Sequence, residues 1–136
     1  MSGYLLDTNV LSELLRKRPM PAVATRRARV RVETLYTSVT CVMELRFGAA
    51  RHPAGRELWK RIVDEVLPRV QVLPVDVVVA VRSGGLLAAL EADGLPIGTE
   101  DVLIAATALV HDLTVVTRNV RHFSRVGGLV VESWWE

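Results

Sequence analysis

The amino-acid sequence predicts an α/β fold, a three-layer α/β/α sandwich built around a mostly parallel sheet of four or five strands. Short continuous apolar runs, such as residues 4–6 and 113–117, are typical of strands that are buried on both faces. Longer segments with helical patterning separate these runs, as the crossovers of a parallel sheet require. The length of 136 residues suits one domain, so we expect residues 1–136 to share one core.

The first half of the chain is expected to alternate between strands and helices. After the strand at 4–6, a helix capped within residues 7–9 runs to about Arg18, because Pro19 and Pro21 break the chain. A second helix is expected at 22–32 and a strand at 35–39. Thr40 can cap a helix through about Ala50, and a further helix covers roughly 55–67.

The second half continues the same alternation. A strand is expected at 70–73, followed by a long helix that opens near Asp76 and runs to about Ala92, with residues 83–85 as a weak point. A helix from about Glu100 to His111 precedes the strand at 113–117, a short turn or helix at 120–123 and a last strand at 129–131. The most apolar stretches, 75–81 and 102–110, are too short to span a membrane, which takes about 20 residues, and are expected in the core.

Composition excludes several classes of protein. A net charge of +2 and a mean hydropathy of +0.28 argue against a polybasic tail binder and against an acidic disordered activator. The single cysteine, Cys41, cannot form an intramolecular disulfide and lies in no Cys/His metal motif. The N-terminus lacks the basic and apolar regions of a signal peptide. We therefore expect a cytoplasmic protein without a membrane segment.

Three acidic positions attract attention because ligands of open parallel sheets bind beyond the carboxyl ends of the strands. Asp7 directly follows the first strand, although an N-cap role would also explain it. Glu44 lies one turn into a helix, between Met43 and Leu45, and could instead belong to an exposed stripe. Asp101 opens another helix, where the helix dipole alone favours acids, and we expect it nearer the sheet than Glu100.

Three converging carboxylates would repel one another unless a cation neutralised them. An all-oxygen ligand set selects a hard ion, Mg²⁺ or Mn²⁺. Such an ion lowers the pKa of a bound water and stabilises charge on a phosphoryl oxygen, so phosphodiester hydrolysis is the expected chemistry.

Four sequence blocks resemble, in order and spacing, the PIN-domain ribonucleases, and most of all the VapC-type toxins of toxin–antitoxin pairs. The blocks are Leu5-Leu6-Asp7-Thr8-Asn9, Glu44-Leu45-Arg46-Phe47-Gly48, Asp101-Val102-Leu103-Ile104-Ala105-Ala106 and Val116-Thr117-Arg118-Asn119. The resemblance implies a metal-dependent endoribonuclease that acts on RNA as a toxin, is held inactive by a cognate antitoxin, and is expected to form a homodimer.

The resemblance also implies individual roles. Asp7, Glu44 and Asp101 match the three recurrent metal-site acids of the family by position. A fourth acid is common after the fourth strand, and here that stretch holds no carboxylate. Asn119 could ligate through its amide oxygen or orient a water, supported by Thr117, while His122 stands where some relatives carry an acid. One tightly held ion is therefore favoured over two.

For each residue near these acids, an ordinary structural role is an alternative to a role in the site. Thr8 and Asn9 can orient the metal ligands or simply cap a helix. Ser38 can bond a water or Asp7, or merely end a strand, and Arg46 and Arg118 can contact RNA phosphates or be surface charges. The basic first third of the chain would attract a polyanion or an acidic partner segment. Trp134 and Trp135 are expected to tie the last strand to the body or to form an interface, rather than to stack on RNA.

Two readings of other classes remain open. A catalytically silent binding module would explain the missing fourth acid. A phosphoreceiver domain also gathers carboxylates around Mg²⁺, but it needs a lysine after the last core strand, and Lys17 and Lys60 fall elsewhere.

Overall fold

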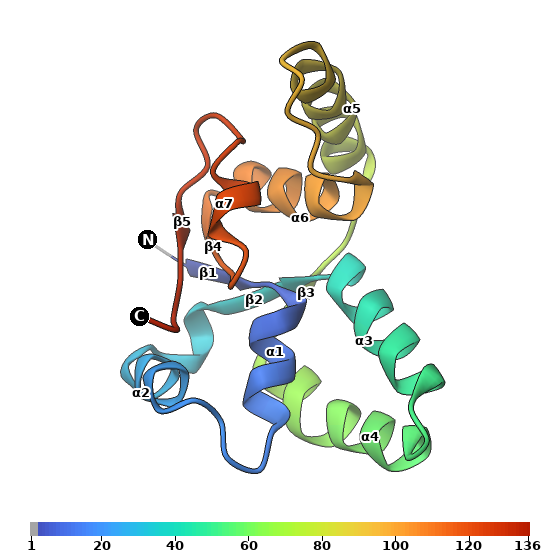
Figure 1. Cartoon of the computed structure of the whole chain (residues 1–136), viewed down its shortest axis with the longest axis vertical. Helices are drawn as coiled ribbons and strands as arrows, with labels where there is room; N and C mark the ends of the chain where they lie inside the picture. Colours follow the sequence, from blue (N-terminus) through green and yellow to red (C-terminus); the bar gives the residue numbers. More distant parts are fainter. Residues whose placement is uncertain (1–2) are drawn as a thin grey trace.

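The computed structural model describes residues 3–136 as a parallel sheet flanked by helices (Figure 1). Five strands pair in parallel in the order β3-β2-β1-β4-β5. The strands are β1 (Gly3–Leu6), β2 (Leu35–Ser38), β3 (Gln71–Leu73), β4 (Leu113–Val116) and β5 (Val131–Glu132). The predicted parallel sheet is confirmed, with five strands.

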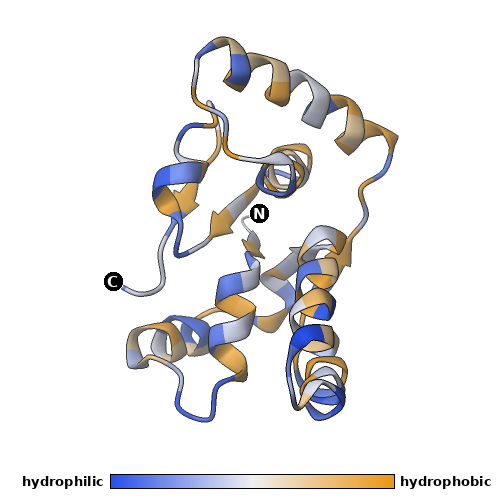
Figure 2. Cartoon of the chain, turned by 45° about the vertical axis from the view of Figure 1, so that its right-hand side comes forward, coloured by the Kyte–Doolittle hydropathy of each residue, from blue (hydrophilic) through white to orange (hydrophobic). Residues whose placement is uncertain are grey.

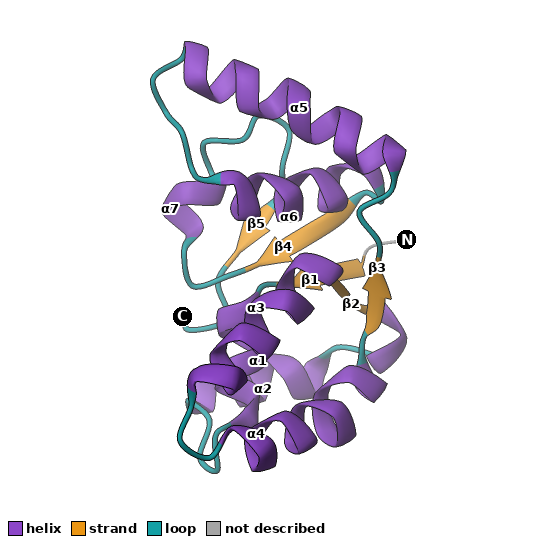
Figure 3. Ribbon diagram, turned by 90° about the vertical axis from the view of Figure 1, so that its right-hand side faces the viewer, coloured by secondary structure: helices purple, strands orange, loops and turns teal. Residues whose placement is uncertain are grey.

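Seven α-helices are assigned within the described residues, and they form two layers. Figure 3 shows α5, α6 and α7 on one side of the sheet and α1 to α4 on the other. The predicted three-layer sandwich is therefore confirmed. The helices are α1 (Thr8–Leu15), α2 (Pro21–Arg29), α3 (Val39–Arg51), α4 (Gly55–Arg61), α5 (Val77–Ala92), α6 (Thr99–Val110) and α7 (Val120–Phe123).

The strand order reverses between β1 and β4. The chain begins in the middle of the sheet, adds β2 and β3 on one side, and then returns to add β4 and β5 on the other. Leu6 and Val116, the last residues of β1 and β4, are register partners, and the backbone N–H of Asp7 donates to the carbonyl of Val116 over 2.9 Å. A crevice opens at such a reversal because neighbouring connections leave in opposite directions.

The core lies on both faces of the central strands, whose residues Leu5, Leu6, Val115 and Val116 are inaccessible to solvent. Figure 2, which is coloured by residue hydropathy, shows that the central strands are largely apolar, as such burial requires. Trp134 is equally buried, packs edge-on against Tyr4 and donates its indole N–H to Glu132. The prediction that a tryptophan ties the C-terminal strand to the body is thus confirmed for Trp134.

Several element ends differ from the sequence prediction, and side-chain bonds explain the first ones. The first helix ends at Leu15 rather than near Arg18. The buried carboxylate of Glu13 accepts the backbone N–H of Met20, and this bond turns the chain after the helix. Residues preceding a proline, such as Arg18, also disfavour helix. The second strand ends at Ser38, because the Ser38 hydroxyl, rather than Thr40, caps α3 by accepting the Thr40 N–H.

The other differences are local. The helix predicted at 22–32 ends at Arg29 and is followed by a 3₁₀ turn (Val32–Thr34). The helix predicted at 55–67 ends at Arg61, and a π-helical turn (Ile62–Val66) and a 3₁₀ turn (Leu67–Arg69) that contains Pro68 complete the connection. The last strand is Val131–Glu132, not 129–131. Residues 83–85 do not interrupt α5, in which the Ser83 hydroxyl donates to the Val79 carbonyl.

The prediction that stretch 75–81 belongs to the core was wrong for most of its residues. Val79 is fully buried, but Val77 and Val81 are 77% and 71% exposed. The reason is the position of α5 as the outermost helix, which packs on α6 through one stripe and leaves its other faces open (Figure 1). Most of the stretch 102–110 is buried in α6, as predicted, and only Leu103, Leu109 and Val110 are partly exposed. No helix among residues 3–136 combines the length and apolarity needed to cross a membrane.

Candidate active site

A cavity of about 640 Å³ lies at the reversal of strand order. It receives side chains from the end of β1, from α1, α3 and α6, from the loop after β4 and from the C-terminal segment. The structure therefore brings the three predicted acids together in one cavity with most of their predicted supporting residues. Its lining comprises Asp7, Thr8, Asn9, Ser12, Glu13, Arg16, Glu44, Asp101, Arg118, Asn119 and Trp135.

Asp7 is both the N-cap of α1 and a wall of the cavity, so the two readings of its position coexist. Its Oδ1 accepts the backbone N–H of Thr8 at 2.8 Å, while its Oδ2 accepts the hydroxyl of Thr117 at 2.8 Å and the amide of Asn9 at 3.3 Å. Burial raises the pKa of Asp7; the hydrogen bonds from Thr117 and Thr8 counteract this effect, and the charge of Asp101 adds to it.

Glu44 projects from the second turn of α3 toward α1. The Thr8 hydroxyl donates to its Oε1 over 2.6 Å, which links the two helices at the cavity. Burial raises the pKa of Glu44, the Thr8 bond lowers it, and the neighbouring charges of Asp7 and Glu100 raise it further. The carboxylate is thus held where its ionised form is electrostatically disfavoured.

Asp101 lies in the first turn of α6, which starts after a turn at Gly98 with φ of 95°. It lines the cavity, whereas Glu100 is exposed, as expected from the sequence. Burial raises the pKa of Asp101, His122 lowers it, and the charge of Glu44 raises it. The Nδ1 of His122 lies 3.5 Å from Asp101 Oδ2, too far for a well-formed hydrogen bond, and has no other hydrogen-bond partner among residues 3–136.

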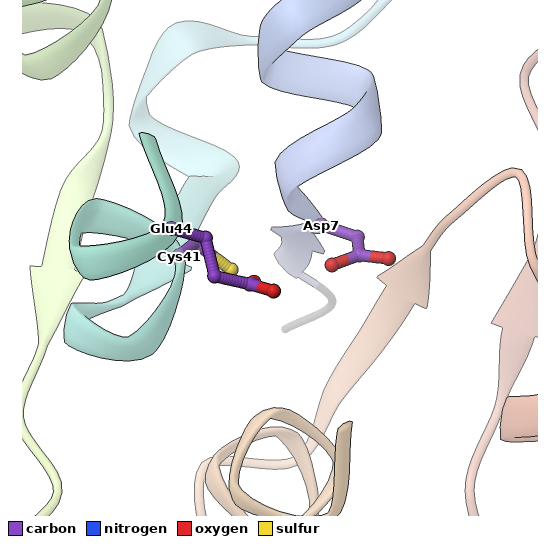
Figure 4. Close-up of side chains that lie close together, drawn as sticks. All are labelled: Asp7, Cys41 and Glu44. Atoms are coloured by element: carbon purple, nitrogen blue, oxygen red, sulfur yellow. The ribbon is translucent and has the colours of Figure 1, made fainter. Parts of the chain in front are cut away.

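These acids fit a divalent cation by the chemistry of the donor set. Each carboxylate has a pKa raised by burial and by another carboxylate, and a cation would relieve both effects. The ligand atoms that lie within 4.8 Å of one another are those of Asp7, Cys41 and Glu44 (Figure 4). Burial raises the pKa of the Cys41 thiol to about 11, which keeps it protonated, and hard cations prefer oxygen. Asp101 lies outside this compact group but lines the same cavity, and its carboxylate would suit a hard cation better than the thiol.

The loop after β4 braces the cavity through Thr117, Arg118 and Asn119. The Thr117 hydroxyl accepts the Asn119 N–H at 2.9 Å while it donates to Asp7. The Arg118 N–H donates to Asn9 Oδ1 at 3.1 Å. This network fixes Asp7, Asn9 and the start of the loop relative to one another, and it presents Asn119 to the cavity.

Three predicted site residues do not line the cavity. One of them, the fully buried Thr117, is linked to it through the hydrogen bond to Asp7. Ser38 is fully buried, and its hydroxyl caps α3, the helix that carries Glu44. Arg46 places its guanidinium over the ring of Trp59, 5.1 Å from the ring centroid, on the outer side of α3.

Four lining residues were not predicted from the sequence. Three of them, Ser12, Glu13 and Arg16, follow Asn9 at helical spacing on α1, so a helical projection from Asn9 could have found them. The fourth, Trp135, reaches the cavity only because the C-terminal segment folds back beside the loop after β4, and no local pattern indicates this.

The fold and the site together define an α/β protein whose acidic cavity at the strand reversal is suited to a divalent cation. The profile of the PIN domain matches residues 4–129. The chain therefore belongs to the PIN-domain family, and the phosphoreceiver alternative is dropped.

Individual relatives resemble the chain over nearly its whole length. The VapC ribonuclease Y4jK of Sinorhizobium fredii is 39% identical, with 96% of each chain covered. The tRNA(fMet)-specific endonuclease VapC of Shigella flexneri is 32% identical, with coverage of 98% and 99%. In the crystal structure of FitAcB from Neisseria gonorrhoeae, the matching chain is 34% identical, superposes with a TM-score of 0.90, and is covered over 99% of its length and 98% of this one.

Proposed function

We propose that the chain is an Mg²⁺-dependent endoribonuclease, with Mn²⁺ as an alternative ion, that acts as the toxin of a toxin–antitoxin pair. The observation that carries the proposal is the meeting of Asp7, Glu44 and Asp101 in one cavity. Relatives named as VapC ribonucleases support the reaction class. The single PIN-like domain is proposed to span residues 1–136 and to act in the cytoplasm, where Cys41 stays reduced.

In this proposal Asp7, Glu44 and Asp101 hold the cation, and Asn119 completes the site through its amide oxygen or by orienting a water. When bound, the ion supplies Lewis acidity at a phosphoryl oxygen and a water of lowered pKa. Thr8 and Thr117 donate to the carboxylates and fix their orientation, while Asn9 joins Asp7 to the loop after β4. Ser38 contributes indirectly, by capping the helix that carries Glu44.

Binding of RNA is proposed to use arginines at the cavity rim. Arg16 and Arg118 line the cavity and are exposed, so they can offset the repulsion between the acids and an incoming polyanion. The last turn of α2 carries further positive charge, on Arg26, Arg27 and Arg29. The predicted phosphate contact of Arg46 would then fall outside the cavity.

A cognate antitoxin is proposed as the inhibitory partner. Structural relatives include VapBC2 of Rickettsia felis bound to a promoter DNA fragment, at a TM-score of 0.87 and 26% identity. A partner segment that covers the acidic cavity would exclude both RNA and water from the carboxylates. A cationic side chain on such a segment would suit the three acids by charge.

A second copy of the chain is proposed to cover the exposed apolar surface of α3 and α5. Val77, Val78 and Val81 are exposed on α5, and Val39, Met43 and Phe47 recur every four residues along α3. The two helices follow the carboxyl ends of neighbouring strands, α3 after β2 and α5 after β3. Apolar patches of this kind mark interaction sites, and a homodimer pairs such a patch with itself.

Cleavage of RNA by the purified protein tests the proposed function. Cleavage is expected with Mg²⁺ or Mn²⁺, should stop with EDTA, and should be lost in Asp7→Asn and Asp101→Asn. Glu100→Gln is the matched control, since this neighbour of Asp101 is exposed and does not line the cavity. Cleavage that persists without metal in both acid variants would refute the proposal, and folded protein that neither binds Mn²⁺ nor cleaves RNA would favour the silent binding module.

A further inference from the structure

Arg118 has an unusual environment for an arginine beside an acidic cavity. Its side chain is exposed and lines the cavity, yet among residues 3–136 no carboxylate forms an ion pair with it. Instead its guanidinium carbon lies over the ring of Trp135, 5.5 Å from the ring centroid. A planar guanidinium stacks well on an indole face and keeps its N–H groups free for another acceptor.

The backbone of Arg118 is already fixed by the site. Its N–H donates to Asn9, and the preceding Thr117 donates to Asp7. The guanidinium stands at the end of a long flexible side chain, so its position depends on what it packs against. The Trp135 ring is the neighbour that limits its range.

Trp135 is held in place by its own backbone neighbours. The backbone N–H of Trp135 donates to the Ser133 hydroxyl at 3.2 Å, and the preceding Trp134 is fully buried. The indole Nε1 of Trp135 is buried and has no hydrogen-bond partner among the described residues. A structural tryptophan usually satisfies this N–H, so here the ring face, and not the N–H, makes the useful contact.

We propose that Trp135 is a positioning residue, which holds the Arg118 guanidinium at the mouth of the cavity so that it binds an RNA phosphate next to the cleaved bond. This inference rests on the proposed ribonuclease function. An arginine free of carboxylates can present two N–H groups to one phosphate. Its location on the rim places that positive charge where the acidic cavity would otherwise repel the RNA backbone.

Equilibrium binding of a short fluorescently labelled single-stranded RNA tests the proposal. The measurement uses the Asp101→Asn background, in which the RNA is expected to stay intact. Trp135→Ala and Arg118→Ala are each expected to weaken binding about fivefold to tenfold, in line with a cation–π contact and one phosphate contact. The double variant should bind no more weakly than Arg118→Ala alone. Trp135→Phe keeps a ring face without the N–H and should bind nearly as tightly as the parent.

Arg51→Ala is the matched control, because Arg51 also lies over an aromatic ring, that of Phe47, but does not line the cavity. It should leave binding unchanged. With Asp101 restored and Mg²⁺ present, Trp135→Ala should raise KM more than it lowers kcat. A further loss from Trp135→Ala in the Arg118→Ala protein would show that the ring contacts RNA itself and would overturn the proposal, as would a Trp135→Phe protein as defective as Trp135→Ala.

Failure of the proposed function is distinguishable, because the wild-type protein would then not cleave RNA and the Asp101→Asn parent would not bind it. Thermal unfolding of every variant, followed by circular dichroism, separates loss of binding from loss of folding. Should Trp135→Ala unfold, the RNA affinities of Trp135→Phe and Arg118→Lys still test the proposal. The lysine keeps the charge but cannot stack or bond in two places, so it should weaken binding while Trp135→Phe does not.

Discussion

Replacement of Thr117 by valine isolates one hydrogen bond to the proposed metal ligand Asp7. Valine preserves the shape of the side chain, which is fully buried, and removes two hydrogen bonds. The hydroxyl donates to Asp7 Oδ2 at 2.8 Å and accepts the Asn119 N–H at 2.9 Å. A hydrogen bond to a charged group contributes about 1.5–3 kcal/mol and a neutral one about 1 kcal/mol, so Thr117→Val should lower the unfolding free energy at neutral pH by about 2.5–4 kcal/mol.

The loss should depend on pH, and its sign follows from the pKa of Asp7. Burial raises this pKa in the folded protein, so the contribution of Asp7 to stability is largest at low pH and falls as pH rises through the folded pKa. The Thr117 bond opposes that rise, so Asp7 in Thr117→Val has a still higher pKa. The difference between the two proteins is therefore smallest in acid, at about 2 kcal/mol for two neutral hydrogen bonds, and grows as pH rises through the wild-type pKa.

Urea unfolding of the metal-free protein from about pH 4 to about pH 8 measures both quantities. Thr107→Val is the matched control, because Thr107 is equally buried but donates only to the Leu103 carbonyl of its own helix. Its loss of about 1 kcal/mol should not change with pH. A Thr117→Val loss that is equally small and equally independent of pH would refute the argument that Thr117 stabilises the ionised carboxylate of Asp7.

Three further predictions concern other parts of the molecule. Gly98→Ala should lower the unfolding free energy by about 1–3 kcal/mol in urea titrations, because φ of 95° is strained for alanine; unchanged stability would contradict this. Val81→Asp should halve the mass measured by light scattering while leaving folding intact, since Val81 is exposed in the single chain; an unchanged mass would contradict the proposed dimer surface. The Cys41 thiol, buried with a pKa of about 11, should not react with a disulfide reagent near neutral pH until the protein unfolds, and rapid labelling of native protein would be the opposite result.

The sequence predicted that three acids would gather beyond the strand ends, because each position follows from a local rule. Asp7 and Asp101 stand at the starts of helices beside strand ends, and Glu44 lies one turn into α3, so topology alone gathers them. The hydrogen bonds from Thr8 and Thr117 connect residues distant in sequence, and only their types suggested a role. The contact of Arg118 with the Trp135 ring depends on the path of the C-terminal segment. No spacing of residues in the sequence indicates that path.

The exposed valines of α5 illustrate a second kind of failure. An apolar run predicts burial, but it does not say what covers it. Val79 is covered by the rest of the chain, while Val77 and Val81 are left exposed by it. Composition cannot distinguish burial within one chain from burial between two chains. The predicted ends of helices and strands were wrong for a related reason, because the hydrogen bonds made by Glu13 and Ser38 override local propensity.

The central claim is that three carboxylates from distant parts of the chain form one site for a divalent cation. Calorimetric titration of metal-free protein with Mn²⁺ tests it most directly. The account predicts one tight site in the wild-type protein and in Glu100→Gln, and its loss in Asp7→Asn, in Glu44→Gln and in Asp101→Asn. Absence of binding to the wild-type protein, or binding of equal strength in the three acid variants, would contradict it.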